Sequence, residues 1–238
     1  MNSKSKNLLR GIFLTFFIFL GNIAYGATAG MQNVTGGFGT TVNEGWDAGG
    51  MTLGFGFEVK STITVTSLGI YDLGADGLIN DHNVGLWGLG GTFLGSATIP
   101  DGTGATLEQG FRYVTLTTPI TLEPGTYAVG AWYVAENYTS SNSTEDTYLI
   151  DGSSNGLGGP LTWNVASEIA WIDSRWKEGP NLTFPSNWLS SAFVGPNFQF
   201  ETAGGGSGNT SVPEPSTLLL LGSGLVGLVG YGRRRFKK

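Results

Sequence analysis

The chain has 238 residues, of which 40 are glycine and none is cysteine, and its formal net charge at pH 7 is −6. Eight of the twelve basic residues lie near the two ends, so the body holds seventeen acidic and four basic side chains, a net charge of about −13 that excludes nucleic acid and anionic lipid as partners. Because cysteine is absent, a hydrophobic core and not disulfides has to hold the fold of this body.

Residues 1–29 have the three parts of a secretory signal peptide. Three basic residues precede an apolar run at 12–20, and small residues recur from Ala24 to Ala29. This order predicts export by the Sec pathway, with a retained N-terminal anchor as the alternative. Cleavage after Gly26 and cleavage after Ala29 satisfy the small-residue requirement equally well.

Residues 30–202 are predicted to form one all-β domain, an antiparallel β-sandwich that is jelly-roll-like with about nine strands. Apolar residues alternate in short runs separated by glycine and proline, and no long stretch has helical periodicity. A change of phase near Ser67 predicts a bulge, and tight turns are expected at 88–91 and 122–125. The expected strands are 51–59, 63–70, 84–87, 92–99, 111–116, 126–134, 148–150, 169–172 and 192–200.

One loop of this domain combines Asp72, Asp76 and Asp81 with two glycines. Carboxylate oxygens in a glycine-bent loop are suitable ligands for Ca²⁺, so a structural calcium site is one interpretation. The other is a loop in which aspartates bind the backbone of their own turns. No other cofactor is expected.

The sequence offers no catalytic constellation, and we predict that the protein is not an enzyme. His82 is the only histidine, no nucleophile-elbow pattern accompanies it, and a single histidine without other strong ligands does not make a zinc site. A polysaccharide hydrolase is the remaining alternative, since seventeen acidic residues provide many possible carboxylate pairs.

Four tryptophans lie in a polar, loop-rich second half of the body, in contrast to Trp87 and Trp132, which we expect in the core. Exposed aromatic rings can form a platform for sugars, whereas most tryptophans of a β-sandwich belong to its core. The candidates for a glycan-binding platform are Trp163, Trp171, Trp176 and Trp188.

Residues 203–211 are rich in glycine and serine and are predicted to be a flexible linker. The motif that follows places a carboxylate between two prolines, which keeps the backbone extended and helix-free. Its residues are Val212, Pro213, Glu214 and Pro215.

The last residues predict a single transmembrane helix with a basic stop. Residues 217–232 carry no charge, and their helix is slightly shorter than a bilayer core requires. Basic residues stay on the cytoplasmic side, so the C-terminus is expected inside and the domain outside. The stop consists of Arg233, Arg234, Arg235, Lys237 and Lys238.

Residues 212–238 resemble the PEP-CTERM sorting signal of Gram-negative bacteria, with the Pro-Glu-Pro motif, the apolar run and the arginine-rich end in that order. The resemblance implies recognition by exosortase, a membrane transpeptidase-like enzyme, after a transient stay in the inner membrane. It also implies a cell-surface or extracellular-matrix protein associated with exopolysaccharide.

The body is similar to a β-sandwich domain of unknown function that recurs in PEP-CTERM proteins. The similarity rests on segments such as 65–72, 82–87 and 122–127 and spans roughly residues 37–201. It implies a fold and supplies no catalytic residues. The alternative to a matrix protein without a ligand of its own is a carbohydrate-binding module that uses the four candidate tryptophans.

Overall fold

The computed structural model of the chain describes residues 27–40, 49–134, 148–151, 159–189 and 192–202. The predicted signal peptide up to residue 26, the linker, the sorting motif and the C-terminal helix lie outside the described residues. Within the described ranges, no helix has the length and apolar character needed to cross a bilayer.

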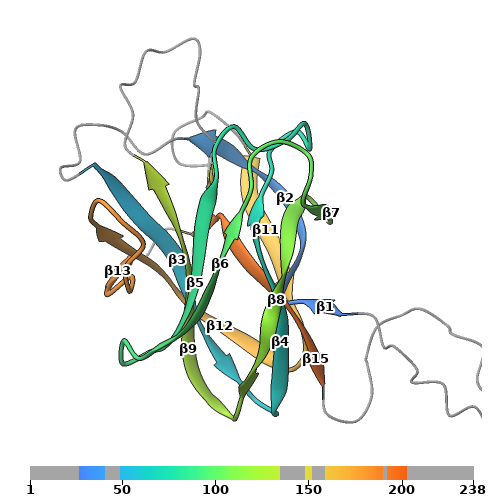
Figure 1. The fold of residues 1–238 in the computed structure, drawn as a ribbon, viewed down its shortest axis with the longest axis vertical. Helices are drawn as coiled ribbons and strands as arrows, with labels where there is room; N and C mark the ends of the chain where they lie inside the picture. Colours follow the sequence, from blue (N-terminus) through green and yellow to red (C-terminus); the bar gives the residue numbers. More distant parts are fainter. Residues whose placement is uncertain (1–26, 41–48, 135–147, 152–158, 190–191, 203–238) are drawn as a thin grey trace, which may run out of the picture.

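The described residues form fifteen strands and no helix, and all their pairings are antiparallel (Figure 1). The order in the six-stranded sheet is β13 (Asn187–Leu189), β12 (Ile169–Glu178), β3 (Gly50–Val59), β9 (Gly125–Val134), β5 (His82–Gly88) and β6 (Phe93–Ile99). The order in the five-stranded sheet is β1 (Thr28–Ala29), β15 (Pro196–Thr202), β4 (Ile63–Tyr71), β8 (Phe111–Leu122) and β7 (Thr106–Glu108). The order in the four-stranded sheet is β11 (Gly159–Val165), β2 (Met31–Thr40), β10 (Tyr148–Ile150) and β14 (Phe193–Val194).

The core lies between the six-stranded and the five-stranded sheets, as in a sandwich, and buried residues of the four-stranded sheet such as Met31 and Leu149 belong to the same cluster. Alternate residues of β3 point inward, and Phe55 and Phe57 are almost completely buried. The ring of Phe57 meets that of Phe198 from β15 at a centroid distance of 4.7 Å. Each such buried ring contributes about 1.5–3 kcal/mol relative to exposure, so this contact between the sheets is a main element of the core.

The prediction of an all-β antiparallel fold is confirmed, and several local predictions are confirmed in detail. The expected strand at 51–59 is β3, and the expected hairpin at 84–99 is the pair β5 and β6. The bulge lies where it was expected, because the pairing of β4 with β8 slips between Val65 and Ser67. The pairing of β15 with β4 slips at the same place.

The predicted number of about nine strands is too low. Five strands, β1, β2, β7, β11 and β13, lie outside the predicted ranges, and β8 and β12 continue well beyond the predicted 111–116 and 169–172. The turn at Glu123 and Pro124 joins β8 to β9, which belong to different sheets. This short connection therefore carries the chain across the core instead of closing a hairpin.

Candidate functional site

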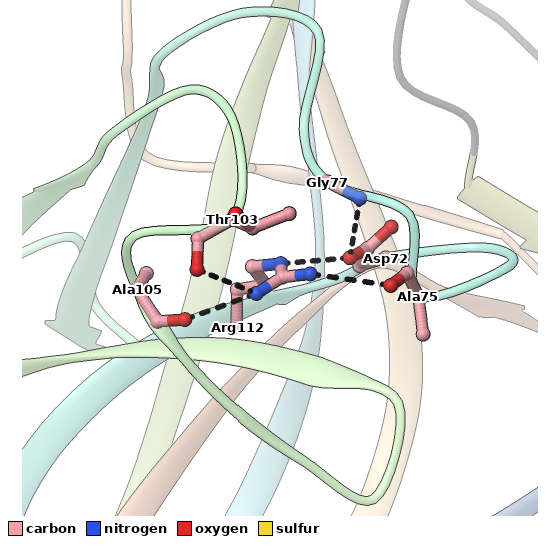
Figure 2. A network of polar contacts seen from close by, with 6 residues as sticks. All are labelled: Asp72, Ala75, Gly77, Thr103, Ala105 and Arg112. Carbon is pink, nitrogen blue, oxygen red and sulfur yellow. Dashed lines mark hydrogen bonds and ion pairs between the residues drawn. The ribbon is translucent and has the colours of Figure 1, made fainter.

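A buried ion pair between Asp72 and Arg112 is the most strongly bonded polar contact of the aspartate-rich loop (Figure 2). The Nε–H of Arg112 donates to Oδ2 of Asp72 over 2.7 Å, and both residues are 3 % exposed. The backbone N–H of Gly77 donates to the same carboxylate oxygen over 3.2 Å. A charge-assisted bond of this length, shielded from water, is stronger than a bond between neutral groups.

Three further N–H groups of Arg112 bind main-chain carbonyls of two loops. Its Nη1 donates to the carbonyls of Thr103 and Ala105, each over 3.1 Å, and its Nη2 to that of Ala75 over 3.3 Å. Figure 2 shows the guanidinium between these two loops. The side chain therefore fixes the loop after β4 to the loop between β6 and β7.

The three aspartates of the calcium hypothesis have different roles in the structure. Asp72 is the partner of Arg112, so its Oδ2 is already bound to a positive charge. Asp81 is exposed and accepts a bond from the backbone N–H of Asp101 over 2.8 Å, while Asp76 is exposed. Among the described residues, no group of three histidine, aspartate or glutamate side chains is arranged to hold a metal ion. Calcium binding by this loop stays a prediction, which a melting temperature raised by Ca²⁺ and lowered by EDTA would support.

His82 is buried at the start of β5, where its Nδ1 lies 3.1 Å from the carbonyl oxygen of Trp132. It borders an open pocket of about 480 Å³, together with Asp81, Asp101 and Trp132. The described lining of this pocket includes no serine, threonine or cysteine. It therefore offers a base and carboxylates but no hydroxyl or thiol nucleophile.

The structure separates the four candidate tryptophans into two groups. Trp163, Trp171 and Trp176 are half-buried and pack against the hydrophobic core. The indoles of Trp163 and Trp171 meet edge to face at a centroid distance of 5.7 Å. Trp188 on the edge strand β13 is 71 % exposed. The four rings therefore do not form a shared exposed platform. Of the four, Trp188 is the one whose ring face is open to solvent.

The neighbour of Trp188 is an ion pair that sequence reasoning missed. Arg175 stands opposite Trp188 in the pairing of β12 with β13, so their side chains share one face of the sheet. Its Nε and Nη2 donate to the two carboxylate oxygens of Asp173 over 2.7 and 2.9 Å. Two parallel bonds of this kind fix both side chains in orientation.

This ion pair lies close to the sheet because Gly56 of β3 has no side chain. A Cβ at residue 56 would lie only 2.5 Å from Oδ1 of Asp173 and 2.9 Å from Nε of Arg175. The outer face of the six-stranded sheet thus combines an exposed indole with a fixed donor and acceptor pair. An apolar ring face beside oriented polar groups is suited to a flat ligand that carries hydroxyl groups.

Comparison with known proteins gives two matches to family models. A model described as a domain of unknown function (DUF4082) matches residues 38–193, which is more than half of the chain. A model described as the PEP-CTERM protein-sorting motif matches residues 211–235, which include the four predicted motif residues and the three arginines of the basic stop. No curated protein matches the chain.

Proposed function

We propose that this chain, which belongs to the DUF4082 family and ends in a PEP-CTERM sorting motif, is a non-enzymatic protein of the cell surface or extracellular matrix. The sorting motif indicates an exported, envelope-associated protein that exosortase processes. The proposal adds Sec-dependent export, a transient stay in the inner membrane with the C-terminus in the cytoplasm, and association with exopolysaccharide. The observation that carries it is the position of the motif after a strongly acidic β domain and a short glycine- and serine-rich segment.

The test is the intact mass and the location of the protein in its host, with and without the processing enzyme. We expect a mass that lacks both the signal peptide and the tail beyond the Pro-Glu-Pro motif, in a fraction outside the membrane. Any additional mass identifies the group to which the new C-terminus is attached. A membrane-bound protein that still contains Arg233 would contradict release and leave a tail-anchored domain.

A second candidate function is favoured by the exposure of Trp188. If the domain binds a glycan itself, we infer that the indole of Trp188 stacks on a sugar ring while the Asp173–Arg175 pair binds its hydroxyl groups. The half-buried Trp163, Trp171 and Trp176 support the core in this arrangement. The ligand would be a neutral polysaccharide chain, because the acidic body repels polyanions.

Replacing Trp188 by alanine is expected to weaken binding to the host's exopolysaccharide about tenfold, the effect of losing roughly 1.4 kcal/mol of binding free energy. Affinity electrophoresis in gels that contain this polysaccharide measures the change. The matched control is Phe93→Ala, because Phe93 is 57 % exposed on β6 at the opposite edge of the same sheet. Equal migration of the two variants would argue against a site at Trp188.

A further inference from the structure

Residues 28–31 are integrated into the fold although they lie within or directly after the predicted signal peptide. Thr28 and Ala29 form β1, which pairs with Phe200 and Gln199 of β15 at the edge of the five-stranded sheet (Figure 1). Ala29 is 2 % exposed and Met31 is completely buried. The family match begins only at residue 38, so these residues are part of the fold without being part of the match.

The next two residues are held by close contacts with β15. The N–H of Gly30 donates to the carbonyl of Phe198 over 2.8 Å. A Cβ at residue 30 would lie 2.8 Å from the ring of Phe198, so only glycine allows the backbone to lie on this core ring. Asn197 binds both main-chain groups of Met31, accepting from its N–H and donating to its carbonyl, each over 2.9 Å.

The two candidate cleavage bonds lead to different folded products. Cleavage after Ala29 would remove β1 and the buried methyl group of Ala29. It would also create a charged α-amino group at Gly30, which lies against the apolar ring of Phe198 and is buried in the intact chain, and a charge beside apolar groups is costly. Cleavage after Gly26 keeps β1 complete and places the charge at Ala27, which is half-buried and precedes the strand.

We propose that the signal peptide is removed by hydrolysis of the bond between Gly26 and Ala27, so that β1 is the N-terminal strand of the mature protein. Water adds across this peptide bond and leaves a carboxyl group on Gly26 and an amino group on Ala27. The residues at the first and third positions before the bond are Gly26 and Ala24, both small as the peptidase requires. The proposal rests on export through a cleaved signal peptide, which is part of the proposed function.

N-terminal sequencing and intact mass of the exported full-length protein test the proposal. We expect a mature chain that begins at Ala27. A chain that begins at Gly30 would overturn this cleavage bond and leave export intact. A chain that still begins at Met1 would overturn the cleaved signal peptide and, with it, the bond proposed here.

Two substitutions in the full-length chain distinguish the bonds independently of the wild-type mass. Gly26→Leu places a large residue directly before the proposed bond, and we expect loss of the product that begins at residue 27. The matched control Ala27→Leu leaves Ala24 and Gly26 unchanged but places a large residue at the third position before the alternative bond. We expect this variant to be processed like the wild type, and loss of its processing would overturn the proposal.

Discussion

Replacing Arg112 by alanine is expected to lower the free energy of unfolding by about 3–5 kcal/mol, the usual cost of removing one partner of a buried ion pair. The substitution leaves the carboxylate of Asp72 uncompensated and, at the same time, leaves the carbonyls of Thr103, Ala105 and Ala75 without the guanidinium. Urea denaturation measures the change as a lower midpoint at an unchanged slope. For a domain of this size we expect the melting temperature to fall by roughly 6–20 °C.

The matched control for this experiment is Arg175→Ala, the only other arginine among the described residues. Its ion pair with Asp173 is bidentate, whereas Arg112 contacts Asp72 through Nε alone, and the side chains of Arg175 and Asp173 are 12 % and 22 % exposed. Solvent screening reduces the contribution of such a pair to about 1 kcal/mol or less. Equal destabilisation by the two substitutions would contradict the structural role assigned to Arg112.

A double-mutant cycle separates the attraction within the pair from the cost of an unpaired charge. Asp72→Asn alone leaves the charge of Arg112 buried, whereas Asp72→Asn combined with Arg112→Met removes both charges. We therefore expect the double variant to lose less stability than the sum of the losses of Asp72→Asn alone and Arg112→Met alone, by about 0.5–3 kcal/mol. Strict additivity would show that Asp72 and Arg112 contribute independently.

Local periodicity explains which parts of the fold could be predicted. The alternation of Leu53, Phe55 and Phe57 indicates β3 without knowledge of its partners. The change of phase near Ser67 likewise indicates the bulge, because the apolar residues of β4 before and after it must stay on the face that meets the core. Such signals arise within a single strand and can be read from a single sequence.

The longest strand that was missed, β2, depends on distant partners. β2 is rich in glycine and polar residues, and its Asn33 has a positive φ of 52°, so its sequence carries little strand propensity. It is a strand because β11 and β10, more than a hundred residues later, pair with it. No local pattern encodes such a pairing.

The candidate sites could be predicted by residue type but not by environment. The aspartates of the loop at Asp72 can be recognised by residue type, but Arg112 cannot, because the alternation of β8 does not show that an arginine is buried between Phe111 and Tyr113. Four tryptophans were candidates for one glycan-binding platform on the basis of the sequence, and of these only Trp188 is strongly exposed. Pairing of β12 with β3 and β13 decides which rings turn inward, and this is a property of the assembled sheet.

Replacing Pro213, Glu214 and Pro215 together by alanine is expected to abolish processing and leave the full-length protein in the membrane. The two prolines restrict the backbone to an extended form that a processing enzyme can bind, and Glu214 supplies its negative charge. Three alanines favour continuation of the predicted helix at 217–232 into this segment, because alanine has the highest helix propensity. Immunoblots of membrane and extracellular fractions, together with the intact mass, measure the retained and the released protein.

The control replaces Ser207, Asn209 and Thr210 by alanine, three positions outside the matched residues 211–235, and we expect normal processing of this variant. Glu214→Gln then separates charge from shape, because it keeps both prolines and the size of the side chain. Retention of Glu214→Gln as complete as that of the triple variant would show that exosortase recognises the carboxylate, whereas partial processing would assign recognition to the extended backbone. Release of the triple variant at the wild-type rate would contradict the function of the motif as a sorting signal and, with it, the processed state on which the matrix role depends.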